Sequence, residues 1–146
     1  MAVLSIPSDI FEKMVAQAKA QAPVEACGIL AGKNNRVEKL YEMTNADNSN
    51  EHFMMEPKEQ FAVAKDIRLA SLEMQAIYHS HPATQARPSA EDIRLALTPD
   101  VTYVILSLQD PKNPEVKGFT IEDSVVTPVP VRIEQEAGMI YNQKSD

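Results

Sequence analysis

The sequence predicts an α/β fold in which a mixed β-sheet is flanked by helices. In some segments apolar residues recur at three- and four-residue spacing, as in amphipathic helices, and in others they form short runs between turn residues, as in strands. The two kinds of segment alternate, which is typical of helices packed on the faces of a sheet. A chain of 146 residues suits one core, so we expect a single domain over residues 1–146 with a polar C-terminal tail from about residue 132.

The first helix is expected over residues 9–21. Its apolar positions at helical spacing are Ile10, Phe11, Met14, Val15 and Ala18. Ser8 or Asp9 can cap the start of this helix, and Pro23 marks its end.

Two later helices are expected over residues 57–72 and 89–97, opened by Pro57 and Ser89. Strands are expected at 25–32, 36–44, 52–55, 74–79, 102–108, 116–121 and 124–131, the last two as a hairpin. After Val131 the chain is mixed and polar, so we expect it to be loosely attached or to form a short helix.

Composition excludes several classes of protein. The net charge is −7, from 14 Lys and Arg against 21 Asp and Glu, and no dense basic cluster is present, which argues against a nucleic-acid partner. Cys27 is the one cysteine, so neither an intrachain disulfide nor a four-cysteine zinc site can form. No leader-like N-terminus or membrane-length apolar run is seen, and we expect a cytoplasmic protein without a membrane partner. The sequence does not determine the oligomeric state, and a homodimer is one of the alternatives.

The histidine pair His79 and His81 predicts a metal site. Residues i and i+2 of a strand point to the same face, about 6.5–7 Å apart, so two imidazoles can lean toward one ion. Asp92 lies in the first turn of the following helix and can fold back over the strand end. Two histidines and a carboxylate leave one position open, as a catalytic rather than a structural zinc site requires.

A zinc hydrolase also needs an acid-base group and an oxyanion donor. Zinc lowers the pKa of its bound water toward about 7, but a base must still move the proton. Glu25 is our candidate, because it begins an apolar strand that can lie beside the histidine strand, where burial raises a carboxyl pKa. Ser89 lies three residues before Asp92, and its hydroxyl could donate to a developing oxyanion.

Each of these residues also has a simpler interpretation when it is taken alone. An isolated His-x-His is more often surface or core histidine than a metal site. Ser89 and Asp92 have the spacing of a helix N-cap and its acidic partner. Glu25 could be a solvated acid at a strand end. Cys27 is better explained as a small buried residue than as a nucleophile, and His52 as a loop residue.

Other zinc enzymes fit the sequence poorly. A nucleobase deaminase needs a His-x-Glu and a Pro-Cys-x-x-Cys pair, whereas this chain has Cys27 alone. A metallo-β-lactamase-like site wants His-x-His-x-Asp-His, but Ala83 and Thr84 follow the histidine pair. The zincin motif His-Glu-x-x-His is absent from the sequence.

Taken together, these residues resemble the signature of the JAMM (MPN+) metalloprotease family. That signature is an upstream Glu, then His-Ser/Thr-His-Pro, then a Ser separated from the second His by seven residues of which the Pro is the first, then two residues and Asp. The chain has Glu25, His79-Ser80-His81-Pro82, Ser89 and Asp92 in this order and spacing. The segments 23–32 and 53–57 also look like the family, so the resemblance runs from the first helix to about Val131.

The resemblance implies a cytidine-deaminase-like sheet and hydrolysis of amide or isopeptide bonds after the Gly-Gly tail of ubiquitin-like proteins. His79, His81 and Asp92 would bind Zn²⁺, Glu25 would be the acid-base residue, and Ser89 would help hold the oxyanion.

The short chain is similar to the compact bacterial and archaeal members of the family, some of which process ubiquitin-like sulfur carriers. We therefore favour a sulfur-carrier protein with a C-terminal Gly-Gly as the substrate. The alternative is a catalytically inactive MPN-type binding or scaffold module, against which the retention of all five polar positions argues.

Overall fold

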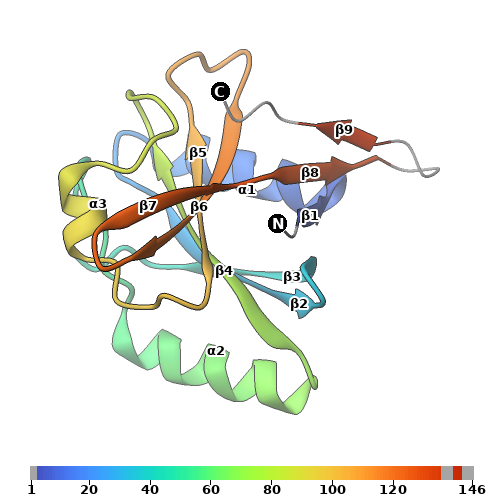
Figure 1. Cartoon of the computed structure of the whole chain (residues 1–146). Helices are drawn as coiled ribbons and strands as arrows, with labels where there is room; N and C mark the ends of the chain where they lie inside the picture. Colours follow the sequence, from blue (N-terminus) through green and yellow to red (C-terminus); the bar gives the residue numbers. More distant parts are fainter. Residues whose placement is uncertain (1–2, 136–139, 143–146) are drawn as a thin grey trace.

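The computed structural model of the chain describes residues 3–135 and 140–142 (Figure 1). The helices are α1 (Ser8–Gln21), α2 (Pro57–Leu69) and α3 (Ala90–Arg94). The strands are β1 (Leu4–Pro7), β2 (Cys27–Lys33), β3 (Arg36–Met43), β4 (Glu73–His81), β5 (Thr102–Ser107), β6 (Glu115–Glu122), β7 (Val125–Val129), β8 (Val131–Glu134) and β9 (Ile140–Asn142). Within the described residues they form one sheet in the order β7-β6-β5-β4-β2-β3-β1-β8-β9.

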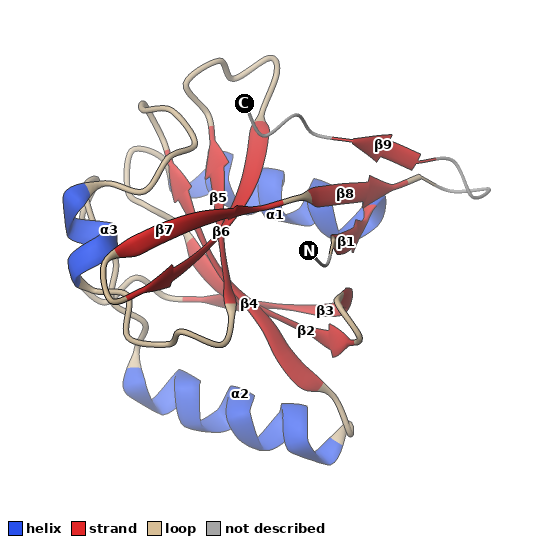
Figure 2. Ribbon diagram, viewed as in Figure 1, coloured by secondary structure: helices blue, strands red, loops and turns tan. Residues whose placement is uncertain are grey.

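The sheet is mixed, because β4 pairs with β5 in parallel and with β2 antiparallel. Helices α1 and α2 lie on opposite sides of it (Figure 2). Successive residues of β2 show this directly: Leu30 packs in the cluster that contains Met14 of α1, whereas Ile29 packs in the cluster that contains Val63 of α2. The predicted fold class, a mixed sheet flanked by helices, is confirmed.

The expectation of a loose or helical segment after Val131 was wrong. Residues Val131–Glu134 form β8, which pairs in parallel with β1, a strand that the sequence did not reveal. Val131 and Ile133 are 4% and 1% exposed, so β8 belongs to the core. Both strands are four residues long, too short for a clear alternating pattern, and their pairing joins opposite ends of the sequence. The tail residues 136–139 and 143–146 lie outside the described residues.

Element boundaries also differ from expectation at the three helices and at one short strand. Helix α1 begins at Ser8, and neither Ser8 nor Asp9 caps it, since Pro7 is at the cap position and no side-chain cap bond is made. Helix α2 stops at Leu69, just before Ser71 turns into the left-handed region at a φ of 57°. Helix α3 is shorter than the expected 89–97, and the expected strand at 52–55 is a single bridge from Met55 to Asn45.

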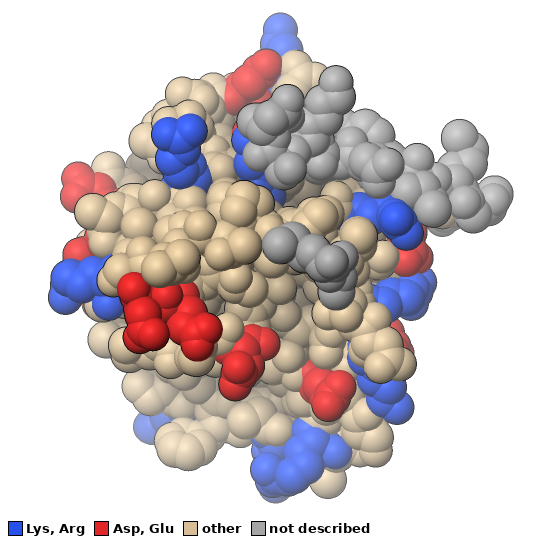
Figure 3. Space-filling model, viewed as in Figure 1, with Lys and Arg blue, Asp and Glu red and all other residues tan. Residues whose placement is uncertain are grey.

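Two surface properties bear on partners. In the described part of the chain no helix combines the length and apolarity needed to cross a membrane. On the face drawn in Figure 3, the described Lys and Arg residues are scattered over a largely uncharged surface.

If β8 is part of the core, Ile133→Ala should lower the free energy of unfolding by about 2–5 kcal/mol, the usual cost of truncating a buried Ile. Val125→Ala on β7, where the side chain is 63% exposed, is the control and should change stability by less than about 0.5 kcal/mol. Urea unfolding measures both variants. Equal small effects would show that residues after Val131 contribute little to the fold.

Candidate metal centre

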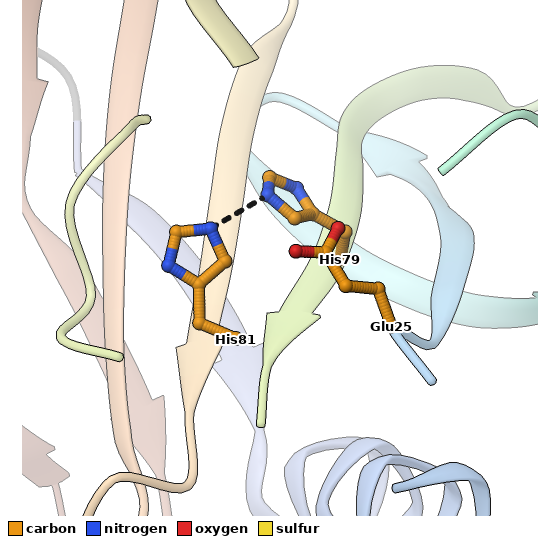
Figure 4. Close-up of side chains that lie close together, drawn as sticks. All are labelled: Glu25, His79 and His81. Atoms are coloured by element: carbon orange, nitrogen blue, oxygen red, sulfur yellow. Dashed lines mark hydrogen bonds between the residues drawn. The ribbon is translucent and has the colours of Figure 1, made fainter. Parts of the chain in front are cut away.

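The two histidines lie together at the buried end of β4 (Figure 4). The strand continues to His81, two residues beyond the expected end, so both residues share its geometry and project from the face opposite α1. His79 is 1% and His81 4% exposed, and their Nε2 atoms are 3.1 Å apart. Phe53 stacks on the His79 ring, with centroids 4.7 Å apart. Sequence reasoning did not single out Phe53 as part of the site, since a loop aromatic gives no spacing signal.

Asp92 reaches the same point from the first turn of α3. Ser89 Oγ accepts a hydrogen bond from the Asp92 backbone N–H at 3.0 Å, and Asp92 Oδ2 accepts from the Ser89 N–H at 2.9 Å. This is a capping box, so the simpler interpretation of these two residues is confirmed. The cap also aims the carboxylate, because Asp92 Oδ2 lies 3.0 Å from His81 Nε2 and 3.2 Å from His79 Nε2.

These three atoms, the candidate ligands, have a spacing that suits a metal ion. They lie 3.0–3.2 Å from one another, and bonds of about 2.0–2.1 Å to a tetrahedral zinc ion would set them about 3.3 Å apart. His81 Nδ1 lies 2.8 Å from the carbonyl oxygen of Gln85, which can only accept, so Nδ1 carries the proton. Whenever His81 is neutral, its Nε2 lone pair therefore faces the Asp92 carboxylate, an arrangement that a cation would relieve. The residues present fit zinc.

Glu25 lies immediately beside this triangle. It precedes β2, which pairs with β4 so that Cys27 faces His79. One atom each from Glu25, His79 and His81 lie within 4.8 Å of one another (Figure 4). Asp92 is the nearer carboxylate to both imidazoles, which favours Asp92 as the third ligand and leaves Glu25 for another task. Glu25 is 3% exposed, and its Oε1 is buried without a protein hydrogen-bond partner.

The electrostatic environment shifts the pKa values of Glu25 and Asp92 in opposite directions. Burial raises the pKa of Glu25 to about 7, the charge of His81 opposes this rise, and the charges of Asp92 and Glu51 add to it. Burial also acts to raise the pKa of Asp92, but hydrogen bonds from His79 and His81 outweigh it and hold that pKa far below its usual range. Asp92 is thus an anion suited to a cation, whereas Glu25 can gain and lose a proton near neutral pH.

The two histidines also differ from each other. Burial lowers the pKa of His79, and Asp92 only partly offsets this effect. Burial acts in the same direction on His81, but the hydrogen bonds to Asp92 and to the Gln85 carbonyl raise its pKa overall. His79 is therefore held as the neutral imidazole that binds metal ions.

A cleft of about 540 Å³ opens beside the triangle, and His79 and Asp92 line one part of it. Its other walls are mainly apolar and include Met54 and Leu97, which are 56% and 83% exposed. An apolar cleft with a few convergent polar groups is the usual form of a substrate site.

The structure decides between the two interpretations that the sequence left open for Cys27 and for His52. Cys27 is fully buried in the cluster against α2, and burial raises the pKa of its thiol to about 12, so it is a packing residue rather than a nucleophile. His52 is a loop residue, as expected. Its Nδ1 lies 3.1 Å from Asp47 Oδ2, and it also lines the cleft.

Comparison with known proteins identifies the family. The family model for prokaryotic homologues of the JAB domain matches residues 7–122, and the chain belongs to this family. The resemblance to the JAMM (MPN+) family is thereby confirmed.

Relatives match much of the chain. The CysO-cysteine peptidase of Mycobacterium tuberculosis is 40% identical over 136 residues, covering 92% of this chain and 93% of that protein. A Thermus thermophilus protein named "Probable TtuB-protein conjugate cleaving protease" is 34% identical over 104 residues, covering 70% and 69% of the two chains. A solution structure from Desulfitobacterium hafniense has a TM-score of 0.83 and 41% identity, covering 90% and 93%. The family thus contains named peptidases.

The raised pKa of Glu25 predicts a pH-dependent effect of Glu25→Gln on the metal-free protein. The pKa rises from 4.5 to about 7 on folding, so the folded protein holds this proton more tightly, and wild-type stability falls as pH rises between these values. Glu25→Gln removes that loss. We expect the EDTA-treated variant to be more stable than wild type at pH 8 and equal to it at about pH 4.5.

Urea unfolding across this pH range measures the effect, with Glu12→Gln on the exposed side of α1 as the matched control. A stability difference that is the same at every pH, or one that grows toward acid, would contradict the raised pKa.

Proposed function

We propose that this chain is a zinc-dependent peptidase that hydrolyses the amide bond after the C-terminal Gly-Gly of a ubiquitin-like sulfur-carrier protein. The observation that carries the proposal is the convergence of His79, His81 and Asp92 on one point, with the buried carboxyl of Glu25 beside it. We also propose that it acts in the cytoplasm.

In this proposal His79, His81 and Asp92 hold the zinc ion. Zinc supplies a Lewis acid that lowers the pKa of water and polarises the substrate carbonyl. The cap on α3 keeps Asp92 in place, and the Gln85 carbonyl fixes the tautomer of His81, so the ligands are set before substrate arrives.

Glu25 moves the proton. It accepts a proton from the attacking water and passes it to the departing amine, and burial suits it to this role because burial raises the pKa of its carboxyl. Ser89 donates to the developing oxyanion, because its Oγ serves the helix cap as an acceptor and its hydroxyl proton is not needed there.

The names of two relatives support the substrate class. One is a peptidase for CysO-cysteine and the other a protease for TtuB-protein conjugates. We carry over to this chain cleavage at the C-terminus of a small carrier protein. The apolar cleft beside the triangle is where such an extended tail would lie.

The alternative, an inactive MPN-type scaffold, is disfavoured by the geometry of the site. A scaffold has no need for three ligand atoms within 3.0–3.2 Å of one another or for a buried carboxyl with a raised pKa. The crowded ligand atoms and the buried carboxyl both lower the stability of the fold. A role in metal binding and catalysis accounts for them, whereas a scaffold role does not.

Glu25→Gln should retain one zinc per chain and lose about 10²–10⁴-fold of kcat, since the amide has the same shape but cannot take a proton. The substrate is a sulfur-carrier protein whose terminal Gly-Gly is joined to aminomethylcoumarin, and fluorescence release gives the rate. Glu12→Gln, on the far side of the sheet, should cleave like wild type.

Wild-type turnover by Glu25→Gln would remove Glu25 from the acid-base role. A zinc-loaded wild type that cleaves no carrier substrate would contradict the proposed function itself.

A further inference from the structure

The backbone of Glu25 is held by contacts from another loop rather than by the sheet. Glu25 lies ahead of β2 and outside its ladder. Its N–H donates to the Ser49 carbonyl at 2.8 Å, and its own carbonyl accepts from Asn45 Nδ2 at 3.0 Å. Both partners belong to the segment between β3 and α2.

Asn45 also organises that segment. Its Nδ2 donates to the carbonyl oxygens of Ser49 and His52, at 3.4 and 3.0 Å. Its Oδ1 accepts from the backbone N–H groups of Asp47 and Met54, each at 3.1 Å. Asn45 is 6% exposed, so one buried amide joins Glu25 to both ends of the loop.

The loop that Asn45 organises is a wall of the substrate cleft. Asp47, His52, Phe53 and Met54 all line the cleft, and Phe53 stacks on the His79 ring. The position of Glu25 and the shape of this wall therefore depend on the same side chain.

A second set of hydrogen bonds, which does not involve Asn45, holds the residue that follows Glu25. The Ala26 N–H donates to Ser80 Oγ at 2.8 Å, and the Ser80 N–H donates to the Ala26 carbonyl at 2.9 Å. These bonds attach the next residue to β4, between the two histidines. Removal of Asn45 should consequently release Glu25 and the loop while the chain from Ala26 onward stays in place.

We propose that Asn45 is a positioning residue that holds Glu25 and the cleft wall at residues 45–54 in one fixed arrangement. Because it acts through Glu25, this inference rests on the proposed function. Asn45 is not among the residues that line the cleft, and its hydrogen bonds go to Glu25 and to its own loop rather than to the ligand triangle. Its contribution is to keep the Glu25 carboxyl within reach of the reacting water, where a misplacement of about 1 Å can cost about 100-fold in rate.

The test uses Asn45→Ala and Asn45→Asp in the zinc-loaded protein with the aminomethylcoumarin substrate. Asn45→Asp keeps the acceptor for Asp47 and Met54 but removes the donor to the Glu25 carbonyl. We expect both variants to bind one zinc per chain and to lose about 10- to 100-fold in kcat.

Gln17→Ala is the matched control. Gln17 is a second buried amide, 6% exposed, that donates to the Cys27 carbonyl at 3.0 Å and accepts from the Tyr78 hydroxyl on the α1 side of the sheet. We expect it to lower the melting temperature as Asn45→Ala does and to keep the wild-type kcat below that temperature.

The Glu25→Gln background separates positioning from general loss of structure. If Asn45 acts on kcat through Glu25 and on the cleft wall only through KM, Asn45→Ala should produce no further fall in kcat once Glu25 is Gln, although KM still rises. An equal fold-loss in both backgrounds, or wild-type kcat in folded Asn45→Ala and Asn45→Asp, would overturn the inference.

Amide hydrogen exchange tests the same inference without turnover. In Asn45→Ala the Glu25 amide should exchange at least about tenfold faster than in wild type, while the Ala26 amide, bonded to Ser80, keeps its protection. Unchanged exchange at Glu25, or an equal change at both amides, would overturn the positioning role. If wild type fails to cleave, the proposed function fails, and hydrogen exchange still decides the role of Asn45.

Discussion

Three electron-rich atoms, the Nε2 atoms of His79 and His81 and Oδ2 of Asp92, are packed 3.0–3.2 Å apart in a buried corner. His81 Nε2 can donate to Asp92 only when the ring is protonated, because the Gln85 carbonyl holds the other ring proton on Nδ1. With His81 neutral, a divalent cation at the centre would be attracted to all three atoms. The positions of the other residues of the site can be understood from this close spacing of the three atoms.

The three atoms come from a central strand and from a helix cap, both of which also stabilise the fold. The histidines come from a central strand whose pairing on both sides fixes their spacing. The carboxylate comes from a helix cap, in which the hydrogen bonds that begin α3 also aim Asp92. The same two hydrogen bonds therefore stabilise the start of α3 and orient the Asp92 carboxylate. A substitution at Ser89 or Asp92 is expected to affect both the helix and the metal site. Glu25 is different, since its backbone lies outside the sheet and is held by Asn45 and Ser49, while the next residue, Ala26, bonds to Ser80.

This difference explains what the sequence could predict. The strand period predicts that His79 and His81 share a face, and cap spacing places Asp92 near the start of a helix. The proximity of Glu25 to them rests in the sequence on family resemblance, because contacts between residues 20 or more apart leave no local pattern. The same limit hid the β1–β8 pairing, the stacking of Phe53 on His79 and the contacts of Asn45. The sheet, the helices and the polar residues of the site were within reach of sequence reasoning, while the segment that positions Glu25 was not.

The proposed function requires one zinc ion among His79, His81 and Asp92. X-ray absorption spectroscopy of the protein loaded with one equivalent of zinc measures these bonds. We expect a first shell of nitrogen and oxygen atoms at about 2.0–2.1 Å with the outer-shell scattering of two imidazoles, and the loss of one oxygen ligand in Asp92→Ala. A sulfur atom at about 2.3 Å, which only Cys27 or a methionine could supply, or a spectrum without imidazole scattering, would contradict it.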